Sequence, residues 1–257
     1  MIERIIESAI LNDFLRRKVI VLLGARQVGK TTLLESLRKK GQKVFSVNCD
    51  DMDDVLLIEE KTSTELRALL APYDLVFIDE AQRVKNIGLT LKKIGDLKLD
   101  TQVVVTGSSS LELADEVNEP ATGRLIEYRL FPFSLSELAA HTSEREEQRM
   151  LEQRLIYGLY PEVVTFPGDA KRTLMTLANN YLYKDLFSYR GLKKPDVLQK
   201  LLRALALQLG SEVSYNELSN LLGVDKETVE NYINLLEKCF VVFRLDSFSR
   251  NLRNEIK

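Results

Sequence analysis

Short continuous runs of apolar residues alternate with amphipathic stretches along the first half of the chain. The apolar runs predict strands at residues 19–23, 44–47, 75–78 and 102–106, and a weaker alternating run predicts an edge strand at 125–130. Amphipathic stretches predict helices at 30–40 and 63–70, the second opened by a Ser/Thr cap. Continuous Val, Ile and Leu runs are typical of parallel sheets that are covered on both faces. We therefore predict an α/β fold with helices on both sides of a parallel sheet.

The pattern becomes helical after residues 130–133, and strand-like runs disappear until the end of the chain. A long helix is expected from about residue 170 to 189, with Leu174 and Leu177 on its buried face. Residues 191–196 then form a short linker into a last module.

In the last module, which runs from residue 196 to 245, the pattern predicts a first helix and then two helices at 213–222 and 226–238 that are joined by a tight turn at Gly223. Asp225 is a natural N-cap for the second helix. The apolar run at 239–243 follows as the first strand of a wing. This order predicts a winged helix-turn-helix.

Composition limits the class of protein. The chain has 257 residues, with 36 Lys and Arg against 38 Asp and Glu, and 45% of its residues are hydrophobic. These values exclude a long disordered tail and a polybasic nucleic-acid coat. The N-terminal residues lack the pattern of a signal peptide, and no apolar run is long enough for a membrane span. Two distant cysteines indicate reduced thiols, so we expect a cytoplasmic protein with no membrane partner.

The strongest motif follows the first predicted strand. It has the phosphate-loop (Walker A) pattern G-x-x-x-x-G-K-[ST], between a strand and a helix. Successive loop N–H groups and the helix N-terminus would face a polyphosphate. Lys30 would supply a full positive charge, and the Thr31 hydroxyl a ligand for Mg²⁺. The predicted nucleotide-binding residues are Gly24, Ala25, Arg26, Gln27, Val28, Gly29, Lys30, Thr31 and Thr32.

A second motif (Walker B) ends the strand at residues 75–78 with two carboxylates, Asp79 and Glu80. The carboxyl ends of parallel strands face the ligand crevice, so Asp79 would reach toward Mg²⁺. Glu80 would orient and deprotonate the water that attacks the γ-phosphate. A small-molecule kinase must exclude such water, and the guanine-reading Asn-Lys-x-Asp of GTPases is missing from the first half. ATP hydrolysis with ATP and Mg²⁺ as cofactors therefore fits best.

Small polar residues end the strand at 102–106, which we expect to lie between the phosphate-loop strand and the Asp-Glu strand. Thr106 or Ser108 would then lie beside the γ-phosphate as a sensor of hydrolysis; a capped turn is the alternative. Arg124, which follows Gly123, is a candidate charge-stabilising finger, acting in cis or toward a neighbouring copy. A surface ion pair is the alternative for Arg124.

DNA is a partner that the last module permits but does not favour. From residue 196 onward there are eight Lys and Arg against nine Asp and Glu. Because phosphate contacts dominate DNA affinity, an acidic recognition helix argues against strong binding in a groove. Three arginines on the wing side could still give weaker DNA binding: Arg244, Arg250 and Arg253. Packing against the ATPase or a protein partner is the favoured role.

Taken together, these motifs resemble the AAA+-type ATPases of an uncharacterised prokaryotic group with an appended domain of unknown function. The resemblance is carried by the phosphate loop extended through Leu34 and by the segments at 78–82, 106–110, 123–124, 130–134 and 158–162. It implies an AAA-like ATPase domain at 1–135, a helical lid at 136–192 and a winged helix at 193–257. It also transfers the roles of Lys30, Thr31, Asp79 and Glu80. Leu159 departs from the pattern, because a Gly is more usual there.

Members of that group typically continue into a nuclease-like segment, whereas this sequence stops at Lys257. We therefore expect a truncated chain and assign no nuclease activity. The predicted function is ATP binding and hydrolysis that switches the lid and the winged helix. Two alternatives stay open: an ATP-modulated DNA-binding protein, and a slow nucleotide-bound scaffold with negligible turnover. A homo-oligomer or a protein partner is compatible with each.

Overall fold

The computed structural model describes residues 2–38, 41–107, 123–179 and 194–245. The chain divides into two compact units, residues 1–179 and 180–257, which are treated separately. In the first unit, the elements that form the sheet and its cover are α1 (Ile5–Asp13), β1 (Val19–Leu23), α2 (Lys30–Ser36), β2 (Val44–Asn48), α3 (Met52–Ile58), α4 (Ser63–Leu70), β3 (Leu75–Asp79), α5 (Ile87–Asp96), β4 (Gln102–Gly107) and β5 (Leu125–Arg129). Short 3₁₀ turns occur at Phe14–Arg16 and Ala81–Arg83.

The described strands form one five-stranded parallel sheet in the order β2-β3-β4-β1-β5. β4 lies between β1 and β3, and β5 lies at an edge, so both predicted placements are confirmed. The register pairs Leu22 with Thr106 and Ile78 with Val105. The carboxyl ends of β1, β3 and β4 therefore meet at one edge of the sheet.

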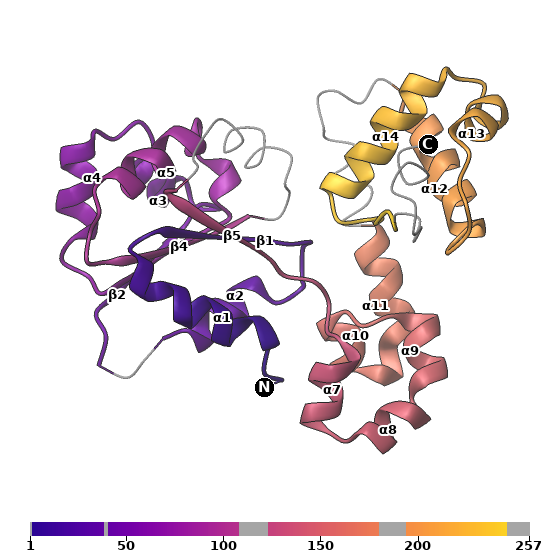
Figure 1. Ribbon diagram of the computed structural model, residues 1–257, viewed down its shortest axis with the longest axis horizontal. Coiled ribbons are helices and arrows are strands. Elements are labelled where there is room, and N and C mark those ends of the chain that lie inside the picture. The colour runs from indigo at the N-terminus through magenta and orange to yellow at the C-terminus, as the bar shows by residue number, and fades with distance from the viewer. Residues whose placement is uncertain (1, 39–40, 108–122, 180–193, 246–257) are drawn as a thin grey trace, which may run out of the picture. The chain divides into compact units, whose positions relative to one another are not determined.

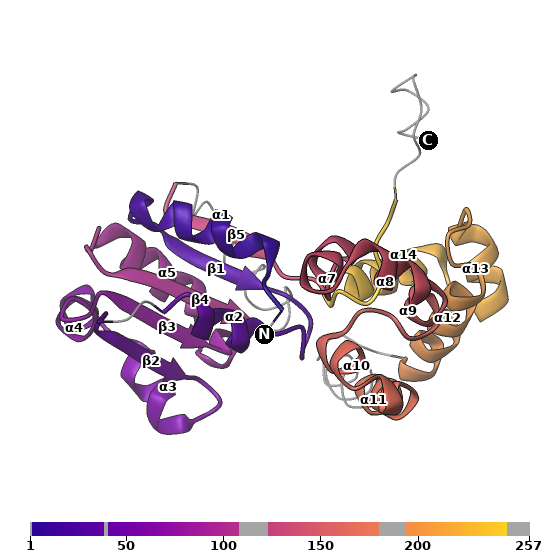
Figure 2. The same ribbon diagram turned by 90° about the horizontal axis from the view of Figure 1, so that it is seen from below.

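Helices cover both faces of this sheet. Figure 1 shows α1 and α2 on one face and α4 and α5 on the other. In Figure 2, α1 runs along β1 and β5, and the Tyr128 hydroxyl of β5 donates to the Ala9 carbonyl of α1 at 3.1 Å. Every residue of β1 and β4 is buried, which explains why these strands are continuous apolar runs. The predicted α/β fold is confirmed for this part of the chain.

Some local features of the sequence were predicted and others were missed. The helix at Ser63–Leu70 is confirmed, with a capping box between Thr62 and Glu65. The helix predicted at 30–40 corresponds to α2, which is shorter than expected and ends at Ser36. Three helices (α1, α3 and α5) were not predicted; α5 carries Gly88 and Gly95, which weaken its helical signal.

Beyond β5 the first unit continues as short helices. They are α7 (Leu135–His141), α8 (Glu144–Arg149), α9 (Leu151–Tyr157), α10 (Pro161–Thr165) and α11 (Ala170–Leu177), with a 3₁₀ turn at Pro167–Asp169. Val163, Ala170 and Leu177 form their shared core, and Leu174 packs against it. Leu174 and Leu177 therefore lie on the buried face as predicted. Most of the rest of the helix expected to reach 189 lies outside the described residues.

The segment that leaves β5 crosses the start of the loop after β1. The Leu130 N–H donates to the Leu23 carbonyl at 2.7 Å, which extends the pairing of the two strands. The Leu130 carbonyl oxygen then lies so close to Gly24 that a Cβ atom there would be only 2.4 Å away. Gly24 is thus required by the close approach of another piece of backbone.

The second unit contains α12 (Pro195–Leu207), α13 (Tyr215–Leu222) and α14 (Lys226–Lys238). Gly223 ends α13 with φ of 65°, and the Asp225 carboxylate caps α14 by accepting from the Thr228 N–H at 2.7 Å. The two helices predicted at 213–222 and 226–238, and the turn at Gly223 between them, are therefore present.

The predicted wing strand at 239–243 is wrong for the described residues. Phe240 has φ of 58°, and the Val241 N–H donates back to the Leu236 carbonyl of α14 at 2.9 Å. This turn closes the end of the helix and uses the backbone groups that a strand would need. Arg244, proposed as a DNA contact, pairs with Glu237 at 2.9 Å; Arg250 and Arg253 lie outside the described residues.

Within the described part of the chain, no helix combines the length and apolar character needed to cross a bilayer. Both cysteines, Cys49 and Cys239, are buried, and neither forms a disulfide.

The contact at Gly24 yields a stability prediction. We expect Gly24→Ala to lower the free energy of unfolding by about 1–3 kcal/mol, because the new methyl group meets main-chain atoms that cannot rotate away. Denaturant unfolding without nucleotide measures this. Gly168→Ala is the control, since a Cβ there meets nothing within 4 Å. Equal losses in the two variants would contradict the close approach.

Candidate functional site

The loop between β1 and α2 curls its backbone around a buried lysine. Gln27 and Gly29 have φ of 61° and 95°, and Gly29 is the residue before α2. The Lys30 side chain is only 5% exposed, and its Nζ donates to the carbonyls of Gly24 and Ala25 at 3.0 and 2.9 Å. A full positive charge is thus held by two loop carbonyls at the N-terminus of α2, where the helix dipole also favours an anion.

Two oxygen ligands meet beside this loop. The Thr31 hydroxyl donates to Asp79 Oδ2 at 2.9 Å, and Asp79 is the last residue of β3. Mg²⁺ is usually held by one or two carboxylates together with hydroxyl, water and phosphate oxygens. The pair therefore fits a Mg²⁺ ion. Within the described ranges, no three His, Cys, Asp or Glu residues are arranged so that they could hold a metal ion together, so Mg²⁺ would need further ligands from water and substrate.

Thr106 connects the two carboxylate residues. It is fully buried near the end of β4, and its hydroxyl donates to Asp79 Oδ1 while accepting the Glu80 N–H at 3.1 Å. Glu80 itself has φ of 53°, a left-handed conformation that is uncommon for a side chain of this type. Its carboxylate accepts from Gln82 Nε2 at 2.5 Å. Thr106 thus fixes the backbone N–H of Glu80, and Gln82 fixes its carboxylate.

Cys49 lies behind this cluster, and its N–H donates to the Asp79 carbonyl at 2.9 Å. Burial raises the pKa of its thiol to about 12, and the negative charges of Asp54 and Asp79 add to the shift. The thiol therefore stays protonated at neutral pH, and nucleophilic thiolate chemistry at this residue is disfavoured.

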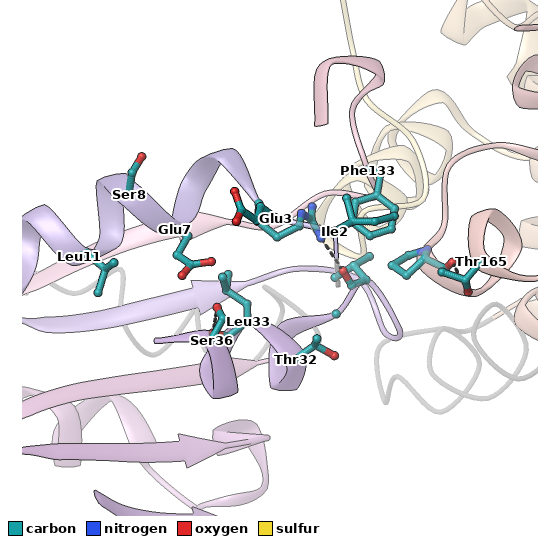
Figure 3. A pocket seen from close by; sticks show the side chains of 14 residues that line it. Ile2, Glu3, Glu7, Ser8, Leu11, Thr32, Leu33, Ser36, Phe133 and Thr165 are labelled. Atoms are coloured by element: carbon teal, nitrogen blue, oxygen red, sulfur yellow. Dashed lines mark hydrogen bonds between the residues drawn. The ribbon is translucent and has the colours of Figure 1, made fainter. Parts of the chain in front are cut away.

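A pocket of about 660 Å³ opens on the other side of the loop. It is bounded by α1, by the loop and α2, and by residues beyond β5, including Phe133 and Pro161. Figure 3 shows Glu7 of α1 directed toward Leu33 of α2 across this space. Its volume lies within the range of about 300–1,000 Å³ that is typical of small-molecule sites.

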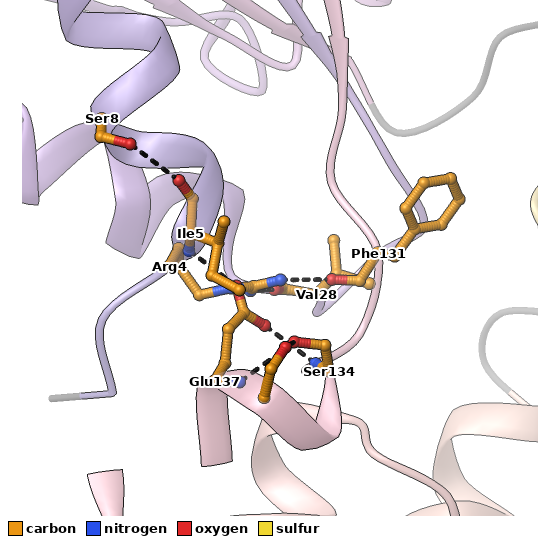
Figure 4. A network of polar contacts seen from close by, with 8 residues as sticks. Arg4, Ile5, Ser8, Val28, Phe131, Ser134 and Glu137 are labelled. Atoms are coloured by element: carbon orange, nitrogen blue, oxygen red, sulfur yellow. Dashed lines mark hydrogen bonds and ion pairs between the residues drawn. The ribbon is translucent and has the colours of Figure 1, made fainter. Parts of the chain in front are cut away.

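Arg4, just before α1, joins the loop to the segment beyond β5 (Figure 4). Its guanidinium donates to the Val28 carbonyl at 3.0 Å, to the Phe131 carbonyl, and to Glu137 Oε1 at 3.1 Å. It also lies over the Phe133 ring, 4.7 Å from the centroid. One side chain therefore contacts three separate stretches of the chain.

Glu137 receives donors from three sides. Besides Arg4, the N–H groups of Ile5 and Ser134 each donate to its carboxylate at 2.9 Å. Burial alone would raise the pKa of Glu137, but the hydrogen bonds from Ser134 and Ile5, followed by Arg4, outweigh it and hold the pKa below its ordinary value. The carboxylate thus completes the capping box of α7 and also caps α1.

The structure brings most of the predicted site residues together. Lys30, Thr31, Asp79, Glu80 and Thr106 lie at the carboxyl ends of β1, β3 and β4. Ser108, the other candidate sensor, lies outside the described residues.

Arg124 is not brought to this cluster. Its carbonyl accepts the Val19 N–H at 3.1 Å, so it lies at the start of β1, at the opposite edge of the sheet. Five strand residues at about 3.3 Å each separate the two edges, which is more than the reach of an arginine side chain. Its guanidinium pairs with Asp96 of α5. This position excludes the action in cis that the sequence had left open.

Sequence reasoning missed Arg4, Glu137 and Gln82 as parts of the site. For Glu137 a signal existed, because Ser134 and Glu137 have the S-x-x-E spacing of a capping box. For Arg4 there was none, since its partners lie up to 133 residues away. Leu159, which departs from the family pattern, contributes a main-chain carbonyl that accepts the Phe133 N–H at 2.9 Å. That contact does not depend on the side chain.

Comparison with known families agrees with this geometry. Residues 16–139 match the family model described as AAA domain, and residues 148–257 match one described as a domain of unknown function (DUF8612). The Walker-type ATPase PABY2304 of Pyrococcus abyssi has a similar structure, with a TM-score of 0.59, 17% identity and coverage of 93% of this chain and 90% of that one. At that identity the likeness shows a shared fold alone. Together with the parallel sheet, these matches support an AAA-type ATPase.

Curated relatives are similar in sequence over most of this chain. An uncharacterized protein of Haemophilus influenzae is 25% identical over 92% of this chain and 63% of its own length. The uncharacterized protein MJ1544 of Methanocaldococcus jannaschii is 24% identical over 90% of this chain and 57% of its own length. The chain therefore spans about three fifths of the length of these relatives.

The lowered pKa of Glu137 predicts a pH-dependent stability. The pKa of Glu137 is lower in the folded chain than in the unfolded chain. Its contribution to the free energy of unfolding is therefore complete above the ordinary carboxyl pKa of about 4.3, and it is lost as the pH falls toward the pKa of the folded state. We expect Glu137→Gln to flatten the fall of the unfolding free energy in this acidic range, as measured by denaturant titrations at several pH values. Glu152→Gln, at an exposed position of α9, controls for the loss of one negative charge. An unchanged slope in Glu137→Gln would refute the prediction.

Proposed function

We propose that this chain binds ATP with Mg²⁺ and hydrolyses it, and that the cycle switches the helical lid and the C-terminal module. One observation carries the proposal: the lysine of the phosphate loop, the Thr31–Asp79 oxygen pair and Glu80 converge at one edge of the sheet. In open parallel sheets this edge is where ligands bind. The match of residues 16–139 to the AAA domain supports the same chemistry.

The phosphates are held by the loop in this proposal. Main-chain N–H groups of residues 25–29 and the Lys30 ammonium bind the β- and γ-phosphate oxygens, and Thr32 follows in the first turn of α2. The Gly24 N–H donates to the Gly107 carbonyl at 3.3 Å, so Gly24 contributes through its lack of a side chain. Thr31 and Asp79 hold the Mg²⁺ ion, which neutralises charge on the phosphates when bound. The remaining loop residues, Ala25, Arg26 and Gln27, contribute their main-chain N–H groups rather than their side chains.

Glu80 is the proposed general base. Its carboxylate takes a proton from the attacking water while the γ-phosphoryl group transfers to that water. Gln82 and Thr106 act as positioning residues, because one holds the Glu80 side chain and the other holds its backbone N–H. Thr106 also contacts Asp79, so it is placed to sense changes around the γ-phosphate.

The pocket beside the loop is the proposed site of the nucleoside. Its walls come from α1 and α2 on one side and from Phe133, Pro161 and Thr165 of the following helices on the other. A base bound there contacts both the ATPase core and the helices that we propose as the lid. Binding and release of nucleotide would thereby change how the two parts pack.

Arg124 is proposed to act in trans. Because it lies at the edge opposite the phosphate loop, it could act as a finger only on a nucleotide bound by a neighbouring copy. The ion pair with Asp96 is exposed, so its loss on assembly costs little. This proposal requires a homo-oligomer.

The role of Glu80 predicts a separation of binding from turnover. Glu80→Gln should bind ATP like the wild type and lose steady-state phosphate release by at least about 100-fold, because general-base catalysis contributes about 10²–10⁴-fold. Lys30→Ala should lose nucleotide binding and so sets the baseline. Glu60→Gln is the matched control, since Glu60 also has positive φ (54°) but lies in an exposed ion pair with Lys85.

Phosphate release that stays normal in Glu80→Gln would remove Glu80 as the base. Absent turnover in the wild type, with ATP still bound, would favour the nucleotide-bound scaffold instead.

The trans role of Arg124 predicts complementation between two inactive variants. Arg124→Ala should bind ATP but release little phosphate, and Lys30→Ala should bind none. A mixture should regain activity, because Lys30→Ala copies supply Arg124 to the intact sites of Arg124→Ala copies. Phosphate release across mixing ratios measures this, with Arg149→Ala, which breaks an exposed ion pair within α8, as the control. A mixture no more active than its parts would exclude a trans finger.

A further inference from the structure

Arg4 contacts the phosphate loop from the side of the pocket, which it lines together with Val28 and Gly29. Its Nη1 donates to the Val28 carbonyl at 3.0 Å, next to Gly29 and the start of α2. Its Nη2 donates to the Phe131 carbonyl, and its Nε donates to Glu137 (Figure 4). The side chains of Arg4 and Glu137 are 9% and 7% exposed, so this ion pair is almost fully withdrawn from water.

We propose that Arg4 and Glu137 are positioning residues that preorganise the loop for nucleotide. This inference rests on the function proposed above. Arg4 sets the direction of one peptide group of the loop, and Glu137 holds Arg4 in the orientation that does so. Neither residue touches the reacting atoms.

The geometry of the peptide bond connects Arg4 to the anion site. In a planar trans peptide the C=O of Val28 and the N–H of Gly29 point in opposite directions. Because the Val28 carbonyl points at Arg4, the Gly29 N–H points away from Arg4, and we take this as the direction of the bound phosphate. Gly29 has no Cβ and can adopt more orientations of this peptide group than another residue, and with φ of 95° the bond from Arg4 selects one of them. Fixing it before nucleotide binds lowers the entropic cost of binding.

A guanidinium suits this task better than an ammonium. Its planar fork reaches three acceptors in fixed directions and stacks on the Phe133 ring at the same time. Glu137 in turn is fixed by two main-chain N–H donors, from Ile5 and Ser134. The ion pair is therefore anchored to main-chain N–H groups at the N-termini of two helices, α1 and α7, rather than to other side chains.

The chain contains a matched ion pair that lies away from the loop. Arg154 of α9 and Glu147 of α8 form two hydrogen bonds at 3.0 and 3.1 Å, and their side chains are 10% and 6% exposed. Breaking this pair costs stability in the same way, because it also leaves a buried charge without its partner. It has no contact with residues 24–29 among the described interactions. It separates a positioning role from a structural one.

The test compares nucleotide affinity with stability in both pairs. Arg4→Gln should raise the dissociation constant for Mg²⁺-ATP about tenfold in calorimetric titrations, as expected for one lost hydrogen bond to a charged group. Glu137→Gln should shift it in the same direction, and Arg4→Lys should lie between wild type and Arg4→Gln. Arg154→Gln and Glu147→Gln should lower the unfolding midpoint as much, yet leave the dissociation constant within about twofold of wild type. Where Arg4→Gln does not fold, Arg4→Lys and Glu137→Gln provide the comparison.

Equal dissociation constants in wild type and the folded Arg4 and Glu137 variants would overturn this inference. An equally large loss of ATP affinity in Arg154→Gln and Glu147→Gln would overturn it as well. Lys30→Ala distinguishes that failure from failure of the proposed function. If wild type binds ATP and Lys30→Ala does not, the site is real and only the positioning role is wrong. If wild type itself does not bind ATP, both proposals fall.

Discussion

A loop that binds an anion through its main-chain N–H groups must place its carbonyl oxygens elsewhere, and each buried carbonyl needs a donor. Here the carbonyls of Gly24 and Ala25 are taken by Lys30 and that of Val28 by Arg4. The segment after β5 is held against the same loop, because the Leu130 N–H bonds to Leu23 and the Phe131 carbonyl bonds to Arg4. The placement of α1, β5 and α7 follows from satisfying this one loop.

The sheet could be predicted because the central strands are buried on both faces, and their sequences are therefore largely continuous apolar runs. The order β3-β4-β1 followed from the usual connection of strands around a phosphate loop. The helix α3 was missed because it is short and rich in acidic residues, with Asp53 and Asp54 in its first turn. The wing was wrong because the apolar run at 239–243 resembles a strand, whereas the end of α14 turns back on itself. Local patterns do not reveal which partner a backbone group will find.

The residues of the candidate site also fall into those that the sequence reveals and those that it does not. Residues that act on phosphate or metal have chemical types and spacings that are recognisable in the sequence, such as Lys30 with Thr31 and Asp79 with Glu80. Residues that hold those groups in place are recognised only by their contacts. Thr106 reaches Asp79 across 27 positions, and Arg4 reaches Glu137 across 133. The position of Arg124 likewise depends on the direction of β5, which the motif alone does not give.

The separation of Arg4 from Glu137 has a consequence for the order of folding. Closing so long a stretch of chain carries a large entropic cost, so contacts within single βα units form more readily. During synthesis the first residues leave the ribosome long before Glu137 does, and the Ile5 N–H at the start of α1 lacks this carboxylate acceptor until then. The loop of residues 24–29 can be built early from its own helix and strand. Its outer face becomes ordered only after the whole sheet has been made.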